Sequence, residues 1–197
     1  MRWLTSENPK RSARSSRDSR SICINHRSRR DHSCWKLRRA HLSLTVYPLN
    51  LRGQVYGSPM PFGLYDPGGT LLHELKAADI SAIVLLAEIE ECKEKTGRDL
   101  LALYREEGLT VFSLPTPNYG IPSNGQLADV LKQAKEHASD GHNVLIHCSA
   151  GLGRTALFAA LLAKDVLGLS GREAIDWLGL HKPDALLTPS QIAMILG

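Results

Sequence analysis

One short stretch constrains this chain more than any other, because it joins a buried strand to an apolar helix through a tight loop with two glycines. It reads Val144-Leu-Ile-His-Cys-Ser-Ala-Gly-Leu-Gly-Arg-Thr155. The residues before the loop are typical of a buried strand, and those after it are typical of a core helix. Glycine allows the backbone to turn its N–H groups inward, and the helix N-terminus adds partial positive charge. We therefore expect this loop to form a nest for a tetrahedral anion.

Cys148 lies at the base of this predicted nest. The dipoles that hold an anion also stabilise a thiolate, so we expect Cys148 to be ionised at neutral pH and to act as a nucleophile. Arg154 can bind two oxygens of a phosphate at once, which a lysine cannot do. Thr155 can donate a hydrogen bond to the sulfur. A structural cysteine would need none of these partners, and a Walker-type nucleotide loop is excluded because the sequence has no Gly-Lys-Ser/Thr.

The spacing His147-Cys148-x5-Arg154-Thr155 resembles the signature of the cysteine-dependent protein tyrosine phosphatase superfamily, and the small size of the chain resembles the dual-specificity branch. Further segments resemble the cyclin-dependent kinase inhibitor-type subgroup: Pro61-Phe-Gly-x-Tyr-Asp-Pro67, Thr96-Gly-Arg-Asp-Leu100 and Leu114-Pro-Thr-Pro117. The resemblance covers about residues 51–197, and the signature loop is its most specific part.

This resemblance implies a central sheet flanked by helices. It implies a two-step reaction in which Cys148 takes the phosphoryl group and water then releases it. By the motif match, His147 supports the thiolate and Arg154 binds phosphate. The loop interior supplies backbone donors to the substrate, from Ser149, Ala150, Gly151, Leu152 and Gly153.

The match is incomplete at the general acid, which in this subgroup is an Asp in a Pro-x-Pro-Asp segment. Here the segment reads Leu114-Pro-Thr-Pro-Asn118, and an amide does not donate a proton usefully at neutral pH. Four possibilities stay open. The first is slow catalysis, with a loss of about 10²–10⁴-fold on poor leaving groups. The second is a substitute acid, either Asp66 or Asp184. The third is a substrate with a good leaving group, and the fourth is a domain that binds phosphorylated ligands without turnover. Asp66 and Asp184 also fit as ordinary turn residues.

We therefore expect a phosphatase that hydrolyses phosphomonoesters, phosphotyrosine first and phosphoserine or phosphothreonine second, through a cysteinyl-phosphate intermediate. The alternative is a catalytically weak phospho-binding domain, because Asn118 occupies the general-acid position. A thiol-based reductase of oxyanions is a third hypothesis, in which Cys92 would serve as a relay. The loop interior has no Lys, which favours a phosphorylated protein or a small aryl phosphate over inositol phosphates. We expect no metal or other cofactor, since Arg154 and the loop amides neutralise the phosphate.

The net charge of +4 averages two unlike parts of the chain. Residues 1–40 carry 12 Lys or Arg and three acids, a net charge of +9, whereas the rest of the chain carries −5. This favours neither a nucleic-acid nor a membrane partner for the folded part. Residues 1–48 are rich in Ser and Arg and predict a disordered arm before a phosphatase-like domain at 49–197. The arm fits a transit peptide, a tail for an anionic partner, or an extension without a role.

The cysteines are few and far apart, without a C-x-x-C pair: Cys23, Cys34, Cys92 and Cys148. This argues against a disulfide framework and for a reducing compartment, so we expect a cytoplasmic protein, with organellar transit as the alternative. The longest apolar runs are too short for a transmembrane helix. A zinc site in the arm is disfavoured because the spacing of its candidate ligands is much shorter than in a zinc finger, namely Cys23, His26, His32 and Cys34.

Strand and helix patterns alternate along the rest of the chain, which predicts an α/β fold with a largely parallel central sheet. We expect strands at 54–56, 80–87, 109–114 and 144–147. We expect helices at 70–79, 91–107, 123–138 and from 154, and two more that begin at 170 and 188. Capping boxes are predicted at the starts of three helices, with Ser123, Ser170 and Thr188 as the first residues. Gln191 fits either the last capping box or a glutamine that orients the hydrolytic water, and Trp177 fits the core.

Overall fold

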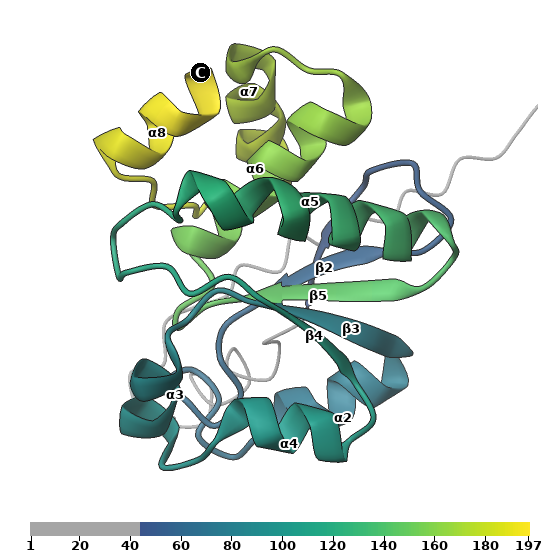
Figure 1. Cartoon of the computed structure of the whole chain (residues 1–197), viewed down its shortest axis with the longest axis vertical. Helices are drawn as coiled ribbons and strands as arrows, with labels where there is room; N and C mark the ends of the chain where they lie inside the picture. The colour runs from purple at the N-terminus through teal and green to yellow at the C-terminus, as the bar shows by residue number, and fades with distance from the viewer. Residues whose placement is uncertain (1–43) are drawn as a thin grey trace, which may run out of the picture. The chain divides into compact units, whose positions relative to one another are not determined.

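The computed structural model describes residues 44–197, except for the side chain of Asn124. Five strands form one sheet in the order β1-β2-β5-β3-β4 (Figure 1). Their bounds are β1 Thr45–Tyr47, β2 Val55–Ser58, β3 Ile80–Leu85, β4 Thr110–Ser113 and β5 Asn143–His147. Only β1 is antiparallel to its neighbour; the pairs β2–β5, β5–β3 and β3–β4 are parallel. The predicted α/β class with a mostly parallel sheet is confirmed.

The strand β1 lies inside the segment that the sequence assigns to the arm. It pairs with β2 in the register Thr45↔Gly57 to Tyr47↔Val55, and Tyr47 is 1% exposed. The folded part therefore begins before residue 49, which corrects the predicted boundary. A strand this short has no alternation long enough to recognise in the sequence. The rest of the predicted arm, with Cys23 and Cys34, lies outside the described residues.

Seven described helices cover the two faces of the sheet (Figure 1). On one face are α2 Thr70–Ala77, α3 Ile89–Thr96 and α4 Leu100–Glu106. On the other face are α5 Asn124–Ser139, α6 Arg154–Leu167, α7 Gly171–His181 and α8 Pro189–Leu196. None of these helices is long and apolar enough to cross a membrane.

The alternation of side chains along the strands divides the core in two. In β5, Val144 and Ile146 join the cluster that packs against α5 to α8, whereas Leu145 joins the cluster under α2 to α4. All three are fully buried. A strand covered by helices on both sides needs apolar residues at every position, which explains its continuous apolar run.

The helix boundaries differ from expectation in two places. The single helix expected at 91–107 is two helices, because Gly97 ends α3 in the left-handed conformation (φ 67°) and the Asp99 side chain accepts a hydrogen bond from Ala102 N to begin α4. Ser123 precedes α5 but makes no capping hydrogen bond with its side chain. The capping boxes at Ser170 and Thr188 are both confirmed.

Candidate active site

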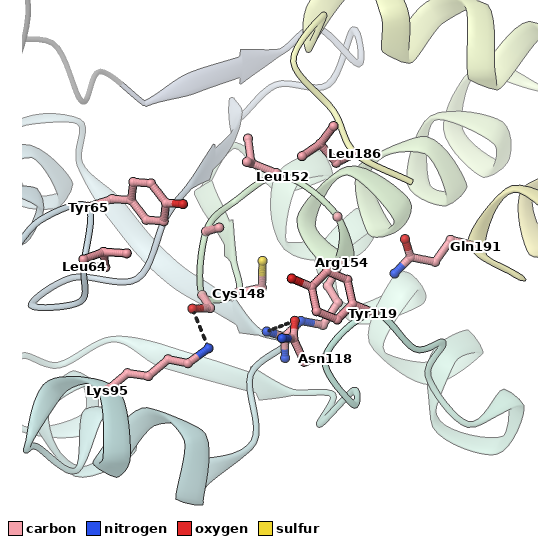
Figure 2. A pocket seen from close by; sticks show the side chains of 13 residues that line it. Leu64, Tyr65, Lys95, Asn118, Tyr119, Cys148, Leu152, Arg154, Leu186 and Gln191 are labelled. Carbon is pink, nitrogen blue, oxygen red and sulfur yellow. Dashed lines mark hydrogen bonds between the residues drawn. The ribbon is translucent and has the colours of Figure 1, made fainter. Parts of the chain in front are cut away.

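A pocket of about 540 Å³ opens where the parallel strands end and their loops meet (Figure 2). This is the edge at which ligands bind in open α/β sheets. Residues from several segments far apart in the sequence line it: Leu64, Tyr65, Lys95, Asn118, Tyr119, Cys148, Ser149, Ala150, Leu152, Gly153, Arg154, Leu186 and Gln191. The structure thus brings together most of the site residues that the sequence predicted, although His147, Gly151 and Thr155 do not line the pocket.

Cys148 directly follows β5, and its sulfur lies at the floor of the pocket. The side chain is almost wholly buried, and the amide of Gly151 donates a hydrogen bond to Sγ at 3.3 Å. Gly151 adopts a left-handed backbone with φ 75°, and a Cβ there would lie 2.8 Å from the carbonyl carbon and oxygen of Ser58. Only glycine fits that conformation and that close approach. The loop after Cys148 is therefore shaped to present the amide hydrogen of Gly151 to the sulfur.

The guanidinium of Arg154 is fixed from several sides. Nη1 donates to Glu91 Oε2 at 2.6 Å and to the carbonyl of Thr116 at 2.9 Å. Nη2 donates to Glu91 Oε1 at 2.8 Å and, over 3.4 Å, to Asn118 Oδ1. Burial alone would lower the pKa of Arg154, but Glu91 and the neighbouring Cys148 outweigh it, so the pKa is raised. Arg154 is a permanent cation in a set orientation beside the sulfur.

Glu91 is a site residue that the sequence did not single out. Burial favours its neutral form, but hydrogen bonds and charges from Arg154 and Lys95 outweigh burial and lower the pKa of Glu91 to about 2. Lys95 donates to Glu91 Oε1 at 2.6 Å and to Ser149 Oγ at 2.9 Å. Glu91 therefore stays ionised and links α3 to the loop after Cys148.

His147 points away from the pocket, and a second unpredicted residue, Tyr104, contacts it. Nδ1 lies 3.1 Å from the carbonyl of Cys148, and Nε2 lies 2.9 Å from Tyr104 Oη. A carbonyl can only accept, so Nδ1 carries the proton and Nε2 accepts from the tyrosine. Burial lowers the pKa of His147 to about 4. The imidazole is neutral at physiological pH, and its hydrogen bond to the Cys148 carbonyl positions that part of the backbone.

Thr155 does not make the hydrogen bond that we expected from its position in the signature. It is fully buried, and its Oγ1 has no hydrogen-bond partner among the described residues, Cys148 Sγ included.

The loop that carries Asn118 lines the pocket and is hydrogen-bonded to the start of α8. The next residue, Tyr119, has a left-handed backbone (φ 61°), and its carbonyl accepts from Thr188 Oγ1 at 3.3 Å. The carbonyl of Gly120 accepts from Gln191 Nε2 at 2.8 Å. Gln191 Oε1 at the same time accepts from Thr188 N, so the capping interpretation of Gln191 is confirmed and its side chain also holds this loop.

Neither expected substitute acid lines the pocket. Asp66 is 2% exposed, and its oxygens accept hydrogen bonds from Thr70 N, Thr70 Oγ1 and Leu71 N at 2.6–3.0 Å, which caps α2. Asp184 forms an ion pair with Lys182 at 3.0 Å and borders a neighbouring hollow of about 290 Å³, which shares Tyr65, Ala150 and Leu152 with the pocket. Asp66 is therefore held in a structural role, and Asp184 lies next to the pocket without lining it.

Cys92 is not placed to act as a relay thiol. It is buried in the apolar cluster under α2 to α4, whereas Cys148 belongs to the cluster on the other face of the sheet. Burial, followed by the charge of Glu91, raises the pKa of Cys92 to about 11. The thiol is thus protonated and inert at neutral pH. Trp177 packs against the core as expected, with its ring centroid 6.0 Å from that of Tyr47.

Residues 44–197 contain no group of three or more His, Cys, Asp or Glu side chains that could hold a metal ion. The positively charged side chains that line the pocket are those of Arg154 and Lys95.

Comparison with known proteins agrees with this geometry. The family model "Polymorphic toxin system, DSP-PTPase phosphatase" matches residues 65–166, which include the whole signature loop. Cyclin-dependent kinase inhibitor 3 of Mus musculus is 30% identical over 105 residues, which cover 53% of this chain and 50% of that protein. Receptor-type tyrosine-protein phosphatase alpha of Homo sapiens is 40% identical over 88 residues, 40% of this chain and 11% of that protein. The chain spans about half the length of the first of these curated relatives.

Solved structures show the same fold. Kinase associated phosphatase superposes with a TM-score of 0.71 at 22% identity, over 78% of this chain and 92% of that one. Tk-PTP in its active form superposes with a TM-score of 0.62 at 30% identity, over 77% of this chain and 95% of that one. The family model, the relatives and the fold agree, and the chain belongs to the DSP-PTPase phosphatase family of polymorphic toxin systems, within the cysteine-dependent protein tyrosine phosphatase superfamily.

Proposed function

We propose that this protein hydrolyses phosphomonoesters, phosphotyrosine foremost, through a cysteinyl-phosphate intermediate on Cys148. One observation carries the proposal. The sulfur lies at the floor of an open pocket, the amide of Gly151 donates to it at 3.3 Å, and the oriented guanidinium of Arg154 lies beside it. A thiolate needs such donors, and so does a phosphate dianion placed above it.

In the first step the Sγ electron pair attacks phosphorus. The S–P bond forms as the bond from phosphorus to the ester oxygen breaks, and the electron pair of that bond leaves with the oxygen. Arg154 neutralises the equatorial oxygens by its charge and the loop amides by hydrogen bonds, while Glu91 and Thr116 hold the guanidinium in place. Positioning of this kind is the main contribution that a protein makes to phosphoryl transfer.

In the second step a water molecule attacks phosphorus and gives up a proton to solvent. The S–P bond breaks, its electron pair returns to sulfur, and inorganic phosphate leaves. His147 acts through Cys148 rather than on the substrate, since its Nδ1 hydrogen bonds to the Cys148 carbonyl at 3.1 Å. This contact fixes the backbone at the point where the strand becomes the loop.

A second candidate function is the binding of phosphorylated ligands without turnover, which a separate observation favours. Asn118 occupies the pocket where the family pattern has an acid, and no Asp or Glu side chain in the described part of the chain lines the pocket. A domain that binds phosphorylated ligands without releasing phosphate would keep Arg154 and the loop and would need no acid.

A trapping experiment separates the two functions. The protein is mixed with p-nitrophenyl phosphate, quenched in acid within one turnover, digested and mapped by mass spectrometry. The proposal predicts one added phosphoryl group on the peptide that contains Cys148, and none on the same peptide from Cys148→Ser. A Cys92→Ser variant controls for the loss of a thiol elsewhere and keeps the adduct. Binding of phosphate analogues without an adduct in the folded wild-type protein would support the phospho-binding function instead.

A further inference from the structure

The pocket has no carboxyl group that could protonate a leaving oxygen. Among residues 44–197, no Asp or Glu lines it. The carboxylate of Glu91 is bound to Arg154 and does not line the pocket. Both of its oxygens accept hydrogen bonds from the guanidinium of Arg154. Asp66 caps α2, and Asp184 is paired with Lys182. The described part of the chain therefore holds a nucleophile and an anion site without the acid that would normally accompany them.

The remaining polar hydrogens around the pocket are poor substitutes. The Lys95 ammonium already donates hydrogen bonds to Glu91 at 2.6 Å and to Ser149 at 2.9 Å. The amide of Asn118 does not ionise. The hydroxyls of Tyr65 and Tyr119 reach toward the pocket (Figure 2), but a phenol is a far weaker acid than a carboxylic acid.

The rim of the pocket is apolar and aromatic. Leu64 is 85% exposed, Tyr119 is 75% exposed and Leu186 is 67% exposed, and Tyr65 and Leu152 stand beside them (Figure 2). Exposed apolar side chains gathered around a polar floor mark a binding surface. They suit a ligand that carries its phosphate on an aromatic ring. The single lysine among the lining residues, Lys95, is already paired, so the rim does not attract further anionic groups.

We propose that this site selects its substrates by the acidity of the leaving oxygen: it cleaves phosphates of phenols, as in phosphotyrosine, and leaves the alkyl phosphates of serine and threonine. The inference rests on the proposed phosphatase function and defines its substrate class. When Sγ displaces a phenol, the electron pair of the broken P–O bond is delocalised into the ring, and the phenolate takes its proton from bulk water afterwards. An alkoxide has no such stabilisation and needs a proton during the step, which general-acid groups supply with a gain of about 10²–10⁴-fold.

The test measures kcat/KM for p-nitrophenyl phosphate, phenyl phosphate and benzyl phosphate. The last two share a ring and differ in whether a phenol or an alcohol leaves. Because kcat/KM reports the first irreversible step, it isolates transfer to Cys148 from later hydrolysis. The variants are Asn118→Asp, which adds a carboxyl group in the pocket, Ser123→Asp, which adds one on the same loop outside it, and Tyr119→Phe.

For the wild-type protein we expect kcat/KM to fall by about 10²-fold or more from p-nitrophenyl to benzyl phosphate. Asn118→Asp raises the benzyl value by about 10²-fold or more and the p-nitrophenyl value by less than about tenfold. Ser123→Asp keeps the wild-type ratio. The wild-type series alone tests the inference if Asn118→Asp does not fold.

Comparable wild-type values for all three substrates would overturn the inference and leave the phosphatase function standing. Loss of benzyl phosphate turnover in Tyr119→Phe would overturn it too and would make Tyr119 the acid. Absence of p-nitrophenyl phosphate turnover in the folded wild-type protein would remove the proposed function itself.

Discussion

The carboxylate of Glu91 forms a bidentate ion pair with the guanidinium of Arg154, with Oε2 2.6 Å from Nη1 and Oε1 2.8 Å from Nη2. Two parallel hydrogen bonds fix the plane of the guanidinium as well as its position. The phosphate-binding group of the proposed site is thus oriented before any ligand arrives. Because Lys95 joins Glu91 to Ser149, the same carboxylate also connects α3 to the loop around Cys148.

Glu91→Gln tests this arrangement. An amide accepts one of the two hydrogen bonds and presents its NH₂ to the other guanidinium nitrogen, so Arg154 loses its orientation and its counter-charge. We expect kcat/KM for p-nitrophenyl phosphate to fall by about 10–100-fold, with a loss of folding stability of about 1–3 kcal/mol. Glu90→Gln, an exposed neighbour on α3, is the matched control and should change neither quantity. Equal activities of the two variants would contradict the role of Glu91.

Gly151→Ala tests the shape of the loop. The added Cβ would lie 2.8 Å from the Ser58 carbonyl atoms at a left-handed backbone, so the loop must move away from β2 and its amide away from the sulfur. We expect activity to fall by at least about 10²-fold, because loss of one positioned donor alone costs that much. In Gly179→Ala the Cβ meets no atom within 4 Å, and a helical alanine should stabilise the fold by roughly 0.5–1 kcal/mol. Wild-type activity in Gly151→Ala would show that the close approach is not required.

His147 makes folding stability depend on pH. Its pKa in the folded protein is about 4, below the ordinary value of 6.5, so between these values the unfolded chain binds a proton that the folded chain does not. The free energy of unfolding is therefore highest above pH 6.5 and falls as the pH drops toward 4, by about 3 kcal/mol from this residue.

Urea unfolding of the wild-type protein and of His147→Gln across this pH range checks the prediction. The histidines elsewhere contribute equally to both proteins, so the difference between the two curves isolates His147. We expect the variant to be less stable at neutral pH and to lose less stability as the pH falls. Parallel curves would mean that the imidazole is not held neutral by the fold.

Gln191→Ala removes the hydrogen bond that fastens Gly120 to α8. The loop with Asn118 and Tyr119 then moves more freely, so we expect faster amide exchange at 118–120 and a KM for p-nitrophenyl phosphate raised by roughly 3–10-fold. Gln126→Ala, at an exposed position on α5, is the control. Unchanged exchange in Gln191→Ala would show that the cap stabilises α8 alone.

The fold and the centre of the site could be predicted because both depend on residues close together in the sequence. The apolar runs of β3 and β5 mark strands buried on both faces, and Cys148 and Arg154 are joined by a single loop. Local geometry brings such residues together whatever the rest of the chain does. The break at Gly97 had a local signal too, a glycine followed by the capping residue Asp99, but the charged run on both sides hid it.

The supporting residues could not be predicted, because tertiary packing alone singles them out. Glu91 is one of several glutamates in its stretch, and only the approach of α3 to the start of α6 decides which of them meets Arg154. In the sequence, Tyr104 is one more apolar residue of a helix. Only the structure shows that its hydroxyl contacts His147. Asp66 is the opposite example, because the sequence suggested a role in the pocket. The structure shows that its side chain instead accepts hydrogen bonds from Thr70 at the start of α2.

The proposed phosphatase activity depends on nucleophilic attack by Cys148, and a comparison of three proteins separates this thiol from the other described one. Hydrolysis of p-nitrophenyl phosphate is followed between about pH 5 and pH 8 for the wild-type protein, Cys148→Ser and Cys92→Ser. The account predicts turnover by the wild-type protein and by Cys92→Ser, and none by Cys148→Ser. Turnover that survives in Cys148→Ser, or a folded wild-type protein that binds phosphate analogues without any turnover, would contradict it.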